Sequence, residues 1–138
     1  MNLPTADDLR MIKRYILLPL VLSEFEQDRK SIGLTVDHAE PYDEMLQAVM
    51  DRVTVDLRKV TTYLRKHGIK VEDTEWTPTT IRARYICRGH TDVLSIMQYL
   101  KDADIKVALR HYLGLHTDQY IRKDLPPGFN VSKPDAVP

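Results

Sequence analysis

Residues 80–92, with the sequence TIRARYICRGHTD, hold the side chains of this chain that are best suited to chemistry. Three arginines, Arg82, Arg84 and Arg88, surround Cys87, the single cysteine of the sequence. Alternate side chains of a β-strand point to opposite faces of the sheet. A strand through this run would therefore place the three arginines on one face and Cys87 on the other face, which has the apolar character of a core.

The three arginines allow two interpretations. Along one strand face they would lie about 7 Å apart, which suits the phosphates of a nucleic acid, so Arg82, Arg84 and Arg88 are candidate nucleic-acid-binding residues. The other interpretation is pairing within the chain, because an antiparallel hairpin would bring acidic residues opposite the arginines. These acidic residues are Glu72, Asp73 and Glu75. We favour the pairing and keep nucleic-acid binding as the alternative function.

Cys87 lies close in sequence to groups that are able to activate a thiol. A reactive cysteine requires a neighbouring cation or a helix start that lowers the pKa of the thiol. Arg88 and His90 are near, but the phosphatase-type loop requires an arginine six positions after the cysteine, and Val93 occupies that position. A free cysteine on an apolar face is usually a small buried hydrophobic residue. We therefore expect a structural Cys87 and predict no catalytic residue; an enzyme with an unrecognised pocket is the least favoured hypothesis.

The five histidines do not form a metal-binding pattern. None of them follows another by three or four residues, and the HExxH motif is absent from the sequence. His111, His116 and Asp118 would converge only if the chain turned back after Gly114. A phosphate-binding P-loop, a dinucleotide fingerprint and a nucleophile elbow are also absent from the sequence. We predict neither a metal ion nor a cofactor.

Composition predicts an ordinary cytoplasmic globular protein. The chain has 138 residues, of which 43% are hydrophobic, and its twenty basic residues balance twenty acidic ones. No third of the sequence carries a strong excess of either charge, which lowers the expectation of a nucleic-acid-binding protein. A single cysteine excludes an internal disulfide and fits a reducing compartment. The longest apolar run, residues 16–22, is too short to span a bilayer, so we expect no membrane association.

Two helical segments dominate the first half of the chain. Thr5 and Asp8 have the spacing of a capping box at the start of the first segment, which reaches Gly33. Pro19 either kinks this helix or splits it in two. Residues 41–68 then form the clearest helix, with Pro41 in its first turn and Gly68 at its end.

The helix over residues 41–68 carries an apolar stripe at helical spacing. Its central members are Met50, Val53, Leu57, Val60 and Leu64. The stripe suits a helical core of the chain itself, because the flanking positions lack the opposite charges that align a coiled coil. It is also a candidate interaction face for a protein partner or a second copy.

The second half of the chain begins with alternating strand patterns and returns to a helical pattern. Residues 69–73 and 80–89 are predicted to form an antiparallel hairpin. Residues 90–114 are predicted to form a helix capped by Thr91, and the proline-rich residues 124–138 an irregular or disordered tail.

The predicted fold is α+β and mainly helical, with two or three packed helices, a small antiparallel β-hairpin, a C-terminal helix and a loose tail. Residues 1–123 form one domain in this prediction. The function we expect is that of a non-catalytic accessory or regulatory protein that binds a protein partner or itself through the long helix.

Overall fold

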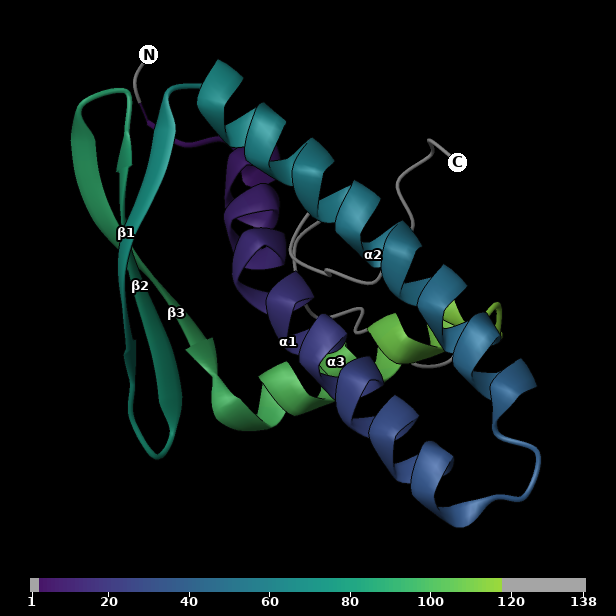
Figure 1. The fold of residues 1–138 in the computed structure, drawn as a ribbon. Helices are drawn as coiled ribbons and strands as arrows, with labels where there is room; N and C mark the ends of the chain where they lie inside the picture. Colours follow the sequence, from purple (N-terminus) through teal and green to yellow (C-terminus); the bar gives the residue numbers. More distant parts are fainter. Residues whose placement is uncertain (1–2, 118–138) are drawn as a thin grey trace.

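The computed structural model describes residues 3–117. Its elements are α1 (Ala6–Thr35), α2 (Glu40–Lys66), β1 (Ile69–Trp76), β2 (Thr80–Cys87), β3 (His90–Met97) and α3 (Gln98–Tyr112). Helices α1 and α2 form a long antiparallel hairpin, with the sheet beside one end and α3 crossing α1 (Figure 1). The predicted α+β, mainly helical class is confirmed. The predicted domain end at residue 123 and the predicted tail over residues 124–138 lie outside the described residues.

Helix α1 is one continuous helix that contains Pro19. The predicted capping box is present at its start: the backbone N–H of Asp8 donates to Thr5 Oγ1 at 3.1 Å, and the N–H of Thr5 donates to Asp8 Oδ2 at 2.9 Å. These two bonds satisfy N–H groups that have no partner within the helix. Pro19 is on an exposed side of the helix. The helix continues past Gly33, where we expected it to end, and stops at Thr35.

Helix α2 packs its apolar stripe against α1. Val53 and Val60 are fully buried and Leu64 is buried, while Met50 and Leu57 are partly buried against the same core. Pro41 lies in the first turn, where its missing N–H costs no helical hydrogen bond. Of the two interpretations of this stripe, the structure therefore shows packing within the chain.

The sheet has three antiparallel strands in the order β1-β2-β3. The β1–β2 hairpin confirms the predicted pairing, with Lys70 opposite Ile86 and Trp76 opposite Ile81. The register shifts between Val71 and Thr74, which is a β-bulge on strand β1.

The prediction of a helix from residue 90 is wrong for its first eight residues. Strand β3 occupies His90–Met97 and pairs with β2 along its whole length, and α3 starts only at Gln98. Arg88 and Gly89 form the connecting turn with φ angles of 49° and 85°. Two left-handed residues in a two-residue loop match the twist of the flanking strands. Cross-strand pairing with β2 thus outweighs the helical spacing of Val93, Ile96 and Met97.

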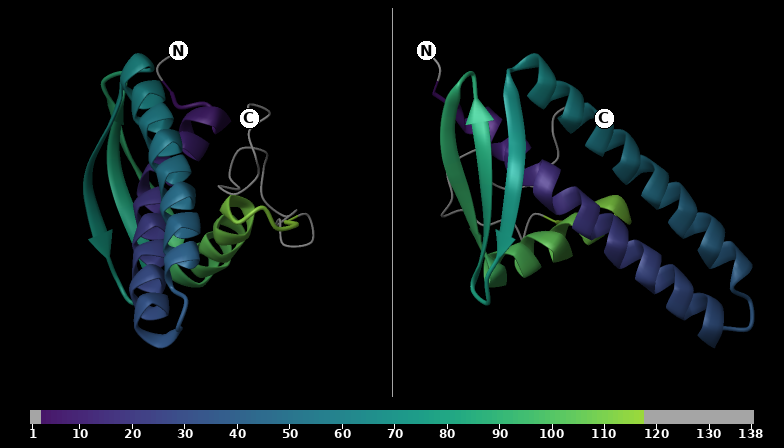
Figure 2. Two further views of the ribbon diagram at one scale, coloured as in Figure 1. Left: turned by 45° about the vertical axis from the view of Figure 1, so that its right-hand side comes forward. Right: turned by 60° about the vertical axis from the view of Figure 1, so that its left-hand side comes forward.

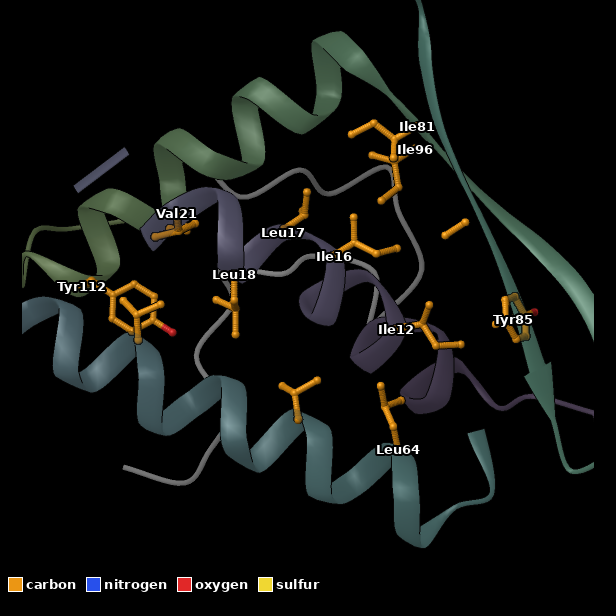
Figure 3. Packing of buried hydrophobic residues seen from close by; sticks show 14 of the residues in the cluster. Ile12, Ile16, Leu17, Leu18, Val21, Leu64, Ile81, Tyr85, Ile96 and Tyr112 are labelled. Carbon is orange, nitrogen blue, oxygen red and sulfur yellow. The ribbon is translucent and has the colours of Figure 1, made fainter. Parts of the chain in front are cut away.

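The core lies between α1 and its three neighbours. Figure 3 shows that Ile81, Ile96 and Tyr85 of the sheet face Ile12 and Ile16 of α1. Further along α1, three buried residues continue the core between α2 and α3. These are Leu17, Leu18 and Val21.

Two buried polar contacts attach α3 to the helical hairpin. Lys13 Nζ of α1 lies 2.7 Å from Asp104 Oδ2 of α3, and both side chains are buried. The hydroxyl of Tyr112 donates to Asp56 Oδ2 of α2 at 2.7 Å. Burial and this hydrogen bond raise the pKa of Tyr112. Because an unpaired buried charge is costly, these contacts specify where α3 lies along the hairpin.

Candidate functional site

Strand β2 presents Arg82 and Arg84 on the solvent side of the sheet, as the alternation predicted. Both are exposed, whereas Ile81 and Ala83, which alternate with them, are fully buried. Arg84 forms an ion pair with Asp73 of the bulge, and Arg82 lies opposite Glu75 in the strand register. The hypothesis of cross-strand pairing is therefore supported at Arg84, whereas Arg82 makes no ion pair with Glu75. Such exposed pairs stabilise a fold little, but they offset the positive charge of this face.

Arg88 does not belong to the arginine face, because it lies in the turn after β2 and not on the strand. Its Nη2 atom is 3.0 Å from Asp8 Oδ2 and 2.9 Å from the carbonyl oxygen of Leu3, and its Nη1 atom donates to His67 O at 2.8 Å. The candidate set Arg82, Arg84 and Arg88 is therefore corrected: the left-handed turn directs Arg88 back to the ends of α1 and α2.

Asp8 is the centre of this cluster, with an exposed fraction of 1%. Burial alone would raise the pKa of Asp8, but hydrogen bonds from the Thr5 backbone, Tyr63 and Arg88 lower it below the usual value. Tyr63 donates its hydroxyl to Asp8 Oδ1 at 2.7 Å, and burial together with this bond raises the pKa of Tyr63 to about 12. The cluster connects the start of α1, the end of α2 and the turn between β2 and β3. Each polar atom named above takes part in a hydrogen bond.

Cys87 is fully buried on the core face of β2. Burial raises the pKa of its thiol above the usual value, although the charge of Arg88 acts in the opposite direction. A buried thiol with a raised pKa is a poor nucleophile. The structure therefore places Cys87 where a structural cysteine was expected.

Within residues 3–117, no three His, Cys, Asp or Glu side chains lie close enough together to hold a metal ion. Asp118, the third member of the sequence-based group with His111 and His116, lies outside the described residues. None of the described helices combines the length and the apolar character needed to cross a membrane.

The structure exposes an apolar surface that the sequence analysis did not identify. It lies at residues 26–45, the last turns of α1, the loop and the first turns of α2, which we call the hairpin end. Phe25 is the last buried residue of α1 and Leu46 is the first of α2. Both views of Figure 2 show the hairpin end projecting beyond the sheet. Ile32 is the one residue of these turns that is partly buried against the hydrophobic core.

Four large apolar side chains of the hairpin end are exposed. Leu34 has an exposed fraction of 88%, Tyr42 of 49%, Met45 of 48% and Val36 of 39%. Scattered apolar residues are common on protein surfaces, but a group on one projecting element is typical of an interaction site. The group was missed because helical spacing places Tyr42 and Met45 near the core stripe, whereas about half of each side chain is exposed in the structure.

A groove of about 390 Å³ lies beside these residues and is lined by Arg29, Lys30, Gly33, Leu34 and Asp43. A Cβ atom added to Gly33 would meet no atom within 4 Å, so the absence of a side chain there leaves the groove open. Arg29 spans the two helices: it pairs with Glu26 at 2.9 Å, hydrogen-bonds to Gln47 and lies 3.6 Å from Asp43.

The hairpin end is acidic. Residues 26–45 contain six acidic and two basic residues, a formal excess of four negative charges. One of the two basic residues, Arg29, is held by acidic partners of the same surface. The surface therefore combines exposed apolar side chains with a negative rim, which suits an apolar partner surface surrounded by basic side chains.

Comparison with known proteins gives one family. The family model described as YhjD protein matches residues 3–117 of the chain, which are also the residues that the structure describes. No curated protein and no solved structure matches the chain.

Proposed function

We propose that this chain, which belongs to the YhjD protein family, is a non-catalytic binding protein that contacts a partner protein through the hairpin end. The observation that carries the proposal is the exposure of Leu34, Tyr42 and Met45 on turns in which no residue is fully buried. Apolar surface exposed in this way gains free energy when a partner removes it from water, by about 25 cal/mol per Å².

The charge of the hairpin end favours a different protein over a second copy of this end. Two hairpin ends packed against each other would bring together two surfaces that each carry an excess of four negative charges. Like charges that face each other across an interface are unfavourable. The partner surface we expect is apolar with a basic rim, and the association should weaken as the salt concentration rises.

Site-specific photo-crosslinking in cells that naturally produce the protein tests this proposal. A photoreactive residue replaces Leu34 or Met45 in the hairpin end, and the control position is the exposed Thr61 on α2. We expect one discrete adduct with another protein from positions 34 and 45 and none from position 61. The same adduct pattern from all three positions, or none from any, would contradict the proposal. An adduct of twice 16.0 kDa would identify a second copy and overturn the assignment to a different protein.

Two substitutions make the test specific for the groove. Gly33→Leu adds a side chain beside the groove at a position where a Cβ atom meets nothing within 4 Å, and it replaces a residue with poor helix propensity. We expect it to abolish the adduct without unfolding the protein. The matched control is Val55→Ser, which removes a similarly exposed apolar side chain from the outer face of α2 and should leave the adduct unchanged.

A further inference from the structure

The outer face of the second half of α2 carries a cluster of basic side chains that lies apart from the hairpin end. Residues 57–71 contain five basic and no acidic residues. Four of them lie on α2 and the fifth is at the start of β1, and all are exposed. We call this cluster the basic face; its members are Arg58, Lys59, Arg65, Lys66 and Lys70.

Helix geometry places the four α2 residues on one side. Arg58 and Arg65, and likewise Lys59 and Lys66, are seven residues apart, which is close to two turns. The opposite side of the same turns holds Val60 and Leu64, which are buried against α1. The core stripe therefore orients the basic side chains outward.

The basic face differs from Arg84 and Arg88 in having no internal partners. Arg84 is paired with Asp73 and Arg88 with Asp8. None of the five residues of the basic face makes a side-chain ion pair or hydrogen bond within the described part of the chain. Their full charge is therefore available to a ligand.

The net charge of zero does not oppose an anionic ligand at this face, because the charges are separated in space. Glu44 in the hairpin end and Arg65 are 21 residues apart on one helix, which corresponds to about 30 Å. The Debye length at 0.1 M salt is about 10 Å, so the acidic end is screened from a ligand at the basic face.

We infer that the basic face binds nucleic acid through the phosphate backbone, without reading base sequence. The four α2 residues extend over about 12 Å, a length of duplex axis that holds three or four phosphates of each strand at a rise of about 3.4 Å per phosphate. Guanidinium and ammonium groups are the usual phosphate contacts. Asparagine and glutamine, which often read base edges, are absent from residues 57–71.

An anionic membrane is a weaker match for the same charges. Basic helices that bind membranes bury an apolar face in the lipid while their cations contact the headgroups. The apolar face of α2 is occupied by α1, with Val53 and Val60 fully buried. The observations therefore favour nucleic acid.

Fluorescence anisotropy with a labelled 20-base-pair duplex at 50 and 200 mM salt tests this inference. Four phosphate contacts give a slope of about −3 to −4 in log affinity against log salt, so affinity should fall roughly 100-fold between the two conditions. The test variant is R58Q/K59Q/R65Q/K66Q, for which we expect loss of measurable binding at 50 mM salt. The same duplex with a scrambled sequence should bind equally well.

The matched control removes four exposed basic residues elsewhere and has the same net charge. It is K30Q/R82Q/R84Q/K106Q, and we expect it to bind within about threefold of the wild type, with circular dichroism confirming that both variants are folded. Absence of wild-type binding at 50 mM salt, or an equal loss in the control variant, would overturn the inference. Binding to phosphatidylserine vesicles but not to the duplex would overturn it in favour of a membrane surface. Gly33→Leu, which tests the hairpin end, should not alter duplex binding.

Discussion

Arg88 Nη2 lies 3.0 Å from Asp8 Oδ2, so a turn residue after β2 neutralises a carboxylate in the first turn of α1, eighty residues earlier in the chain. The same guanidinium donates to the carbonyl oxygen of His67 just after α2. One side chain thus joins the start of α1, the end of α2 and the β2–β3 turn. Its role is to hold these segments together, which explains why the arginine is available neither to a ligand nor to Cys87.

The buried carboxylate of Asp8 predicts a pH-dependent contribution to stability. Its pKa in the folded protein lies below the unfolded value of about 3.9, so the contribution is fully present above that value and is lost as the pH falls through the folded pKa. Asp8→Asn should lower the free energy of unfolding by roughly 1–3 kcal/mol at pH 7, because hydrogen bonds to a charged group are lost. The difference from the wild type should shrink below about pH 4.

Urea unfolding at pH 7, 5 and 3 measures this effect, and Asp7→Asn is its control. Asp7 is adjacent in sequence, but its side chain has an exposed fraction of 71%, so its replacement should change the free energy of unfolding by less than about 0.5 kcal/mol. The stabilising role of ionised Asp8 would be contradicted if both substitutions changed the free energy of unfolding equally. It would also be contradicted if the difference between Asp8→Asn and the wild type grew as the pH fell.

The ion pair between Lys13 and Asp104 should be essential for the position of α3. Both side chains are nearly inaccessible, with exposed fractions of 6% and 3%, and their charged atoms are 2.7 Å apart. Lys13→Met removes this partner from the buried carboxyl group of Asp104, which should cost about 3–5 kcal/mol. Thermal and urea unfolding measure the cost, with Lys106→Met as an exposed control on α3. A cost below about 1 kcal/mol would show that the pair does not hold α3 in place.

Cys87 should resist thiol reagents while the protein is folded. The residue is fully buried and burial raises its pKa, so reaction with DTNB at pH 8 requires the chain to open. We expect the folded protein to react at least about a hundredfold more slowly than the urea-unfolded protein. Thr61→Cys adds an exposed second thiol as a control that should react at once. Immediate reaction of the wild-type protein would show that Cys87 is accessible.

Two glycines should respond oppositely to alanine. Gly33 is helical with open space around it, so Gly33→Ala should raise the free energy of unfolding by roughly 0.5–1 kcal/mol. Gly68 has a φ of 67°, and a Cβ there would lie 3.1 Å from Cγ of Arg88, so Gly68→Ala should destabilise by about 1–2 kcal/mol. Equilibrium urea unfolding distinguishes the two. A destabilised Gly33→Ala would show that the space beside this residue is not open.

Local chemistry in the sequence was sufficient to predict much of the fold. The capping box of Thr5 and Asp8, Pro41 at the start of α2 and Gly68 after it are short-range signals whose physical effect does not depend on distant residues. The β1–β2 pairing also followed from alternating side chains. Strand β3 was missed because its helical spacing is a local signal, whereas its pairing with β2 and the left-handed pair Arg88 and Gly89 are set by the sheet.

By itself, the sequence determined where the long helices begin, which stripe of α2 is apolar and how many charges the chain carries. Only the tertiary structure decided which charged and apolar groups are left for a partner. Strand register and turn geometry decide which charged side chains form ion pairs. Arg84 and Arg88 form such pairs, whereas Arg58 and Arg65 remain unpaired among the described residues. Burial depends on how the elements pack around a helix, which covers Val60 and exposes Met45 on the same helix. Both are long-range relationships, and they separate the acidic and basic charges that cancel in the composition.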